Sequence, residues 1–112
     1  MRYMVMLTRG VWEDTGTEDE RQRAYGEIRE WWAGQVAQGK IIEGQRLQPA
    51  DTSTTLVLRH GEARLIDGPF METKETIGGY AIVDVADLDE AIAMFRGFPC
   101  PDGKAEIRPV VE

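Results

Sequence analysis

The chain has 112 residues, which is enough for a single domain over residues 1–112 and too few for a second. Its 20 acidic and 13 basic side chains give a net charge of −7, which disfavours nucleic acid and anionic membranes as partners because both are negatively charged. With 42% hydrophobic and 29% charged residues, the composition is that of a folded globular domain and excludes a disordered acidic tail.

The first half of the chain predicts a strand, a long helix and a second strand. Residues 2–8 alternate with apolar side chains on both faces, which is typical of a central strand. We expect a polar loop over residues 9–16, after which Thr17 and Glu20 form a capping box that begins the helix. A second strand is predicted at residues 41–47. The apolar stripe of the helix consists of Ala24, Ile28, Trp31, Trp32 and Val36.

The second half of the chain predicts a hairpin, a core strand, a helix and a final strand. We expect residues 54–66 to form an exposed hairpin, with a positive φ at Gly61 in the turn. A core strand is predicted at residues 77–85, a helix capped by Asp87 follows, and a last strand is predicted at residues 105–111. The buried stripe expected for this helix consists of Leu88, Ala91, Ile92 and Phe95.

Without the hairpin, the order of the elements is strand, helix, strand, strand, helix, strand. This is the ferredoxin-like βαββαβ order, an α+β fold with an antiparallel sheet and two helices on one face, into which the β-hairpin is inserted. Met4, Met6, Ala81 and Val83 are apolar although helices cover only one side of such a sheet. We therefore expect a homodimer in which a partner subunit covers the other side.

The segment Asp67-Gly68-Pro69-Phe70-Met71-Glu72-Thr73-Lys74-Glu75 concentrates charge between two strands. In a structural interpretation, Asp67 closes a turn and the remaining charges are solvated. In a catalytic interpretation, Asp67 or Glu75 accepts a proton, Lys74 holds an anionic group and Phe70 forms an apolar wall. The residues alone leave both interpretations open, and the structural one is the more common.

Other residues that could form a site also have more ordinary explanations. Trp31 and Trp32 are adjacent, so one is expected in the core and the other at a pocket rim or interface. Arg46 and Arg108 interrupt apolar strands, and each could pair with a carboxylate such as Glu43 or Glu75 or bind an anionic substrate.

The single cysteine and the single histidine indicate neither a metal nor a cofactor. Cys100 cannot form a disulfide within the chain and has no nearby base to activate it, so we interpret it as an incidental thiol. His60 is expected to be an exposed turn residue. No metal site is predicted, since one histidine and no cysteine cluster leave only carboxylates in unsuitable spacings.

The DGPFMETKE segment, followed by Ile77-Gly78-Gly79-Tyr80 and Asp87-Leu88-Asp89-Glu90-Ala91, resembles the signature of the YCII-related, or DGPF-domain, family. The resemblance extends to the N-terminus, the segment before the hairpin and the last strand. It implies a ferredoxin-like dimer of the dimeric α-β barrel type, a small-molecule pocket lined by the motif, and genes that often lie beside extracytoplasmic-function sigma factors. Some relatives carry a His and Asp pair, but His60 is the only histidine here and lies in the predicted turn, so that pair is not carried over.

These features lead to two functional hypotheses. The first is a small cytoplasmic homodimer that binds a polar or aromatic metabolite near the motif, as a lyase or isomerase using Asp67 with Lys74. The alternative is a non-catalytic accessory or regulatory protein linked to a sigma-factor system. We expect the cytoplasm because residues 1–10 resemble neither a signal peptide nor a membrane span.

Overall fold

The computed structural model describes residues 1–68 and 76–112. Most of the elements follow the predicted order, and one short helix is added near the N-terminus. The elements are β1 (Arg2–Thr8), α1 (Trp12–Thr15), α2 (Glu18–Ala37), β2 (Ile41–Arg46), a 3-10 helix (Ala50–Thr52), β3 (Thr54–Arg59), β4 (Glu62–Asp67), β5 (Ile77–Asp84), α3 (Leu88–Arg96) and β6 (Ala105–Pro109).

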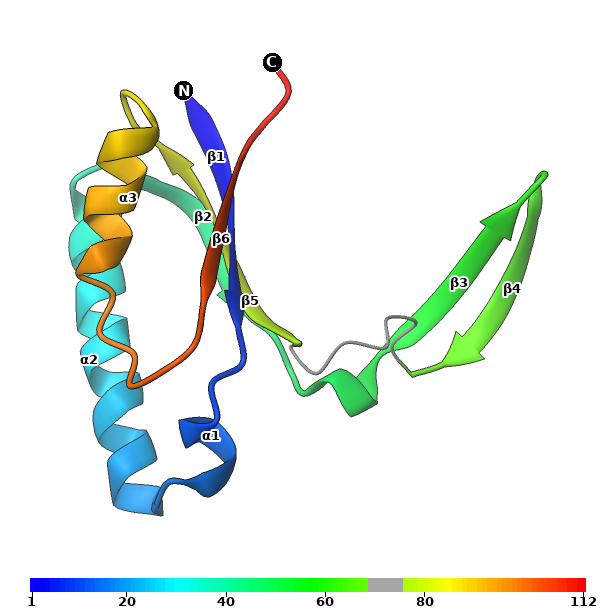
Figure 1. Ribbon diagram of the computed structural model, residues 1–112, viewed down its shortest axis with the longest axis horizontal. Helices are drawn as coiled ribbons and strands as arrows, with labels where there is room; N and C mark the ends of the chain where they lie inside the picture. The colour runs from blue at the N-terminus through cyan, green and yellow to red at the C-terminus, as the bar shows by residue number, and fades with distance from the viewer. Residues whose placement is uncertain (69–75) are drawn as a thin grey trace.

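The main sheet has four strands in the order β2-β5-β1-β6, and every neighbouring pair is antiparallel. Figure 1 shows α2 and α3 side by side on one face of this sheet. The predicted ferredoxin-like α+β fold is therefore confirmed. The hydrophobic core lies between the sheet and the helices and is centred on Val5 and Val83, which are fully buried.

The N-terminus of α2 forms as the sequence predicts. The Thr17 hydroxyl accepts a hydrogen bond from the Glu20 backbone N–H at 3.2 Å, and the Thr17 N–H donates to the Glu20 carboxylate at 3.3 Å. This capping box satisfies two of the free N–H groups at the start of the helix. No helix in the described part of the chain combines the length and the apolar character that crossing a membrane requires.

The polar loop expected at residues 9–16 is wrong in part, because α1 lies within it. One contact that holds α1 is local: the Gly10 N–H donates to the Glu13 carboxylate at 3.1 Å. Another comes from far along the chain, where the Asp102 carboxylate accepts from the Val11 N–H at 2.7 Å. A single helical turn whose N-terminus is capped from a distant loop leaves little signal in the local sequence.

The predicted apolar stripes are correct in the middle of each helix and wrong at one end. Val36 in α2 is 49% exposed and Leu88 in α3 is 45% exposed, whereas Met94, which was not predicted, is buried. Periodicity identifies which face of a helix is apolar, but it does not reveal how much of the helix the sheet covers.

The strand register corrects the expected placement of apolar residues on the two faces of the sheet. Val83 lies opposite Tyr3 and Ala81 opposite Val5, and all four are buried under the helices. The other face, which the helices leave open, carries Met4 opposite Ile82 and Met6 opposite Tyr80.

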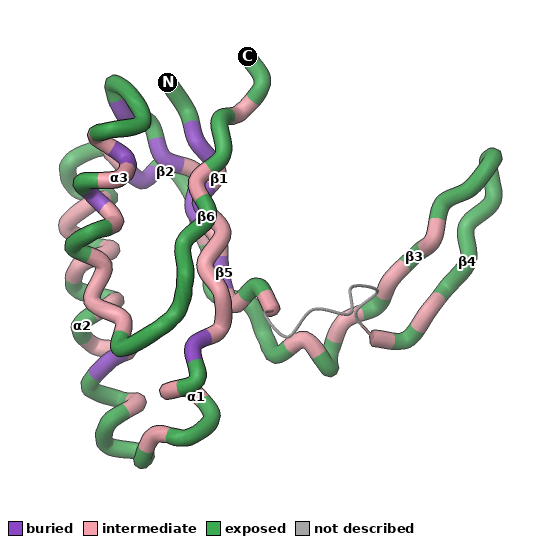
Figure 2. The backbone as a smooth tube through the Cα atoms, in the orientation of Figure 1, coloured by how far each residue is buried: buried purple, intermediate pink, exposed green. Residues whose placement is uncertain are grey.

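The β3–β4 hairpin is a separate two-stranded sheet, which confirms that it lies outside the ferredoxin-like core. It projects away from the main sheet on the side opposite to the helices (Figure 1). Its turn has a positive φ at His60 (50°) as well as at Gly61 (81°). No residue of the hairpin is buried (Figure 2). The radius of gyration is 15.9 Å, against about 13 Å for a compact domain of this length.

Candidate ligand-binding site

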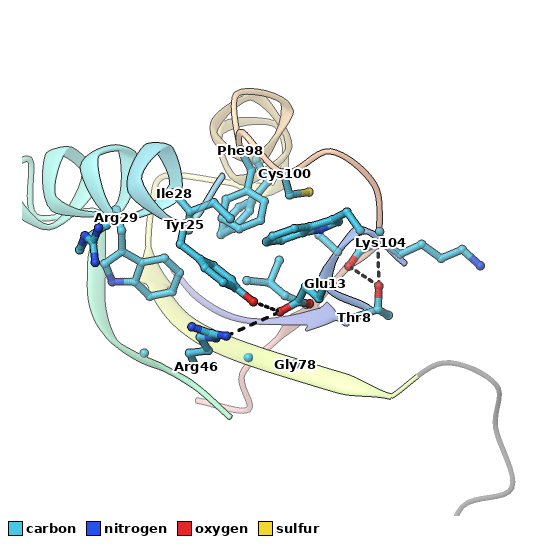
Figure 3. Close-up of a pocket in the computed structure, with 18 of the residues that line it drawn as sticks. Thr8, Glu13, Tyr25, Ile28, Arg29, Arg46, Gly78, Phe98, Cys100 and Lys104 are labelled. Atoms are coloured by element: carbon cyan, nitrogen blue, oxygen red, sulfur yellow. Dashed lines mark hydrogen bonds and ion pairs between the residues drawn. The ribbon is translucent and has the colours of Figure 1, made fainter. Parts of the chain in front are cut away.

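A cavity of about 690 Å³ lies between α2 and the sheet, at the end of the molecule where α1 is found (Figure 3). Its walls come from α1, α2, the ends of β1 and β2, the beginning of β5, the end of α3 and the segment that follows α3. The volume falls within the range of about 300–1,000 Å³ that is typical of small-molecule sites.

Aromatic rings form much of the cavity wall. Trp12 and Tyr25 contact each other with ring centroids 5.0 Å apart. A Cβ atom placed on Gly44 would lie 2.4 Å from the Trp32 ring, so the absence of a side chain there allows this indole to approach β2 closely. The aromatic residues that line the cavity are Trp12, Tyr25, Trp32, Phe95 and Phe98.

The polar part of the cavity is built around the Glu13 carboxylate, whose side chain is only 11% exposed. One oxygen, Oε1, accepts a hydrogen bond from the Tyr25 hydroxyl at 3.0 Å and lies 3.6 Å from Arg9 Nη1 and 4.0 Å from Arg46 Nη2. The other oxygen accepts from the Gly10 N–H at 3.1 Å. Glu13 therefore has donors at both oxygens and fixes the orientation of the side chains around it (Figure 3).

Tyr25 and Arg46, two members of this cluster, face the cavity, and contacts within the protein hold both side chains in place. Burial, followed by the hydrogen bond to Glu13, raises the pKa of Tyr25, which keeps the phenol protonated as a hydrogen-bond donor. The Arg46 guanidinium lies 3.9 Å from the centre of the Tyr25 ring. Since the Arg46 side chain is also 63% exposed, it is held from one side and remains accessible at the cavity mouth.

The charge of the cavity differs from that of the chain. Among the described residues that line it, Arg29, Arg46 and Lys104 are basic, whereas Glu13 and Asp102 are acidic. Both acids are already engaged with protein donors, Glu13 as described and Asp102 with the Val11 N–H. A chain with a net charge of −7 thus has a cavity whose lining carries an excess of positive charge.

Cys100 also lines the cavity and is half-buried. Burial is the main cause that raises the pKa of its thiol. A thiol with a raised pKa is a poor nucleophile near neutral pH, which supports the interpretation of Cys100 as incidental. Within residues 1–68 and 76–112, no three His, Cys, Asp or Glu side chains form a group that could hold a metal ion.

The structure brings two of the predicted pocket residues, Trp32 and Arg46, into this cavity. Trp31 instead packs against Phe95 and Phe98, with ring centroids 5.2 and 5.1 Å apart. Trp32 is thus the member of the pair that lines the cavity, and Trp31 is the member that packs beside the core.

The remaining predicted residues do not line the described part of the cavity. Arg108 lies on β6 and pairs with Glu106 at 2.8 Å. Asp67 is exposed at the end of β4. Phe70, Lys74 and Glu75 lie outside the described residues.

Sequence reasoning missed Arg9, Trp12, Glu13 and Tyr25. The first three lie in or beside the predicted polar loop, where no periodic signal separates a cavity residue from a solvated one. Tyr25 does have such a signal, because Tyr25, Ile28 and Trp32 follow the i, i+3, i+7 spacing of one helical face and all three line the cavity.

Comparison with known proteins agrees with the family that the sequence resembles. A family model described as the YCII-related domain matches residues 1–112. An uncharacterized protein of Rhizobium meliloti (strain 1021) is 33% identical over 97 residues, which cover 84% of this chain and 78% of the relative. The chain therefore belongs to the YCII-related domain family.

Proposed function

We propose that the protein binds a small organic anion with a flat, apolar body in the cavity between α2 and the sheet. The observation that carries this proposal is the position of Arg46, which lies over the Tyr25 ring at the mouth of an aromatic-walled cavity. A guanidinium held in this way is preorganised to pair with a carboxylate or a similar planar anion.

The cavity offers both apolar surface and positive charge, which match the flat body and the acidic group of such a ligand. Trp12 and Trp32 offer apolar area for a ring system, and Arg46 with Arg29 offers positive charge for an acidic group. Arg29 forms no ion pair with any residue in the described part of the chain, so its charge remains available to a ligand. A neutral ligand of the same shape would gain only the apolar contacts.

Binding, rather than catalysis, is the function that the described residues support. The hypothesis of a lyase or isomerase relied on Asp67 with Lys74, and Asp67 is an exposed residue outside the cavity lining. Within the described part of the cavity, the Tyr25 hydroxyl donates its hydrogen bond to the Glu13 carboxylate, so these two groups are engaged with each other. The accessory role beside a sigma-factor system and the cytoplasmic location stay predictions.

The proposal is tested with 2-naphthoate, an aromatic carboxylate, and with 2-naphthamide, its neutral analogue. Thermal-shift and tryptophan-fluorescence titrations measure the dissociation constants of both compounds. We expect Arg46→Met to weaken naphthoate binding about tenfold, which corresponds to about 1.4 kcal/mol, and to change amide binding little.

Two control variants separate a site effect from a general charge effect. Arg108→Met removes the same charge from the sheet face away from the cavity, and Asp67→Asn alters the motif while keeping its shape. Both should bind naphthoate within twofold of the wild-type protein. No naphthoate binding by the wild type, or equal losses for the Arg46 and Arg108 variants, would contradict the proposed site.

A further inference from the structure

Three polar side chains from three different elements meet at the cavity: Glu13 from α1, Tyr25 from α2 and Arg46 from β2 (Figure 3). In the proposed function Arg46 binds the acidic group of the ligand, so the groups beside its guanidinium determine which anions bind. The guanidinium lies 3.9 Å from the centre of the Tyr25 ring, and the Tyr25 hydroxyl is at the edge of that ring. A group next to the carboxylate of a bound ligand is therefore within reach of the Tyr25 oxygen.

The Tyr25 hydroxyl donates its single hydrogen within the protein. It donates to Glu13 Oε1 at 3.0 Å, and its raised pKa keeps it a neutral phenol at neutral pH. A hydroxyl oxygen also has lone pairs that accept hydrogen bonds. No group in the described part of the chain donates to this oxygen. Toward a ligand, the Tyr25 oxygen is therefore an acceptor.

Glu13 fixes the direction of this hydrogen bond. A carboxylate accepts hydrogen bonds and does not donate them, so the hydrogen of Tyr25 stays directed at Glu13. The Glu13 side chain is 11% exposed, and its Oε1 atom also lies 3.6 Å from Arg9 Nη1 and 4.0 Å from Arg46 Nη2. A ligand group that can only accept would face the lone pairs of the Tyr25 and Glu13 oxygens and would lose the hydrogen bonds it had made with water. This part of the cavity therefore selects a donor.

The charge of the lining favours a neutral donor over a charged one. Among the described side chains that line the cavity, three are basic and two are acidic, and both acids are engaged with protein donors. An ammonium group beside the Arg46 guanidinium would be repelled by it and would lose much of its hydration. A hydroxyl group donates a hydrogen bond without carrying charge, so the expected donor is a hydroxyl.

We propose that the ligand is an aromatic α-hydroxy acid, whose carboxylate pairs with Arg46 while its hydroxyl donates a hydrogen bond to the Tyr25 oxygen. This inference rests on the proposed function, because it adds a second polar contact to the same bound anion. Trp12 and Trp32 contact the aromatic body of the ligand. Tyr25 is then a specificity-determining residue, which distinguishes a hydroxy acid from an acid of the same shape that lacks the donor.

Calorimetric titration of the wild-type protein with three matched acids tests this proposal without any variant. The acids are 2-naphthylacetate, its α-hydroxy derivative and its α-fluoro derivative, the last two as separate enantiomers. Fluorine is close to a hydroxyl in size but cannot donate a hydrogen bond. We expect the better enantiomer of the hydroxy acid to bind about fivefold more tightly than the other two acids, which is the effect of about one net hydrogen bond.

The same titrations separate failure of this inference from failure of the proposed function. Equal affinities for the hydroxy and fluoro acids would overturn the inference and leave the anion site intact. Absence of binding by all three acids would also overturn it, and titration with 2-naphthoate then shows whether the proposed function fails as well.

Two tyrosine variants locate the effect at Tyr25. Tyr25→Phe removes the acceptor oxygen and keeps the ring beside Arg46, so the preference for the hydroxy acid should fall below about twofold while 2-naphthylacetate binds within about threefold of wild type. Tyr80→Phe is the matched control, because the Tyr80 hydroxyl also donates to a glutamate, Glu43, at 3.0 Å but lies outside the cavity lining. This control should keep the preference. A preference that survives Tyr25→Phe, or equal losses in the two variants, would overturn the role of Tyr25.

Discussion

At the scale of single residues, Glu13 holds the polar side chains of the cavity in place. Nothing in its local sequence distinguishes it from a solvated glutamate. Its Oε1 atom receives the Tyr25 hydroxyl and lies near two guanidinium groups, and its Oε2 atom caps a backbone N–H. A carboxylate that is only 11% exposed and has this many donors is costly to remove, because its partners would be left unsatisfied. The cluster therefore fixes Arg46 and Tyr25 in the geometry that a ligand would meet.

The raised pKa of Tyr25 makes stability depend on pH in the alkaline range. Because the folded-state pKa lies above the unfolded value of about 10, the contribution of Tyr25 is fully present below about pH 10 and is lost as pH rises through the folded-state value. The free energy of unfolding of the wild-type protein should therefore decrease more steeply above this pH than that of Tyr25→Phe. Denaturant titrations at a series of pH values measure the difference, and identical slopes for the two proteins would contradict the prediction.

Two glycines differ sharply in what a methyl group would contact. We expect Gly44→Ala to destabilise the protein by about 1–3 kcal/mol, because the new Cβ would clash with the Trp32 ring and with the Tyr80 carbonyl oxygen. Gly34→Ala, within α2, places its new Cβ more than 4 Å from every described atom outside the neighbouring helix backbone and should stabilise the protein by up to about 1 kcal/mol. Chemical denaturation measures both, and equal effects would show that the close approach at Gly44 is unimportant.

At the scale of elements, α2 depends on its N-terminal cap as well as on packing. Ala24 is its one buried residue, and the capping box satisfies backbone donors at its start. Thr17→Ala should reduce the free energy of unfolding by about 1 kcal/mol, because the Glu20 N–H loses its acceptor. Thr17→Asn, which keeps a capping oxygen, should cost much less. Thermal and chemical unfolding compare the two variants, and equal losses would exclude a role for the cap.

Contacts within a single chain explain the stability of the hairpin less well than that of the other elements. Full burial of a leucine side chain contributes about 1.5–3 kcal/mol, and three leucines of the hairpin are each more than half exposed. A partner that covered them would therefore stabilise the hairpin and the dimer together.

At the scale of the whole molecule, a dimer makes stability depend on protein concentration. If two copies share their apolar surfaces, the melting temperature of the wild-type protein should increase with concentration, because association favours the folded state by mass action. The double variant Leu58→Ser with Leu65→Ser, which replaces two exposed leucines of the hairpin, should show a weaker increase. Calorimetry over a hundredfold range of concentration measures this, and a constant melting temperature would contradict a folded dimer.

The sequence alone is sufficient to predict those structural features that depend on neighbours within a few residues. The Thr17 and Glu20 cap, the alternation of β1 and β5 and the turn of the hairpin require only local hydrogen bonds and periodic side chains. The order of these elements was then sufficient to predict the ferredoxin-like sheet.

The position of the cavity and the residues that surround it could not be predicted from the sequence, because they depend on the tertiary structure. Glu13 and Tyr25 are 12 positions apart, and the Asp102 carboxylate is 91 positions from Val11, whose N–H donates to it at the start of α1. No local pattern records such contacts, because they exist only when α1, α2, β2 and the segment after α3 are packed together. The same reason explains why Arg46 and Arg108 looked equivalent as strand arginines, although only Arg46 lies at the cavity.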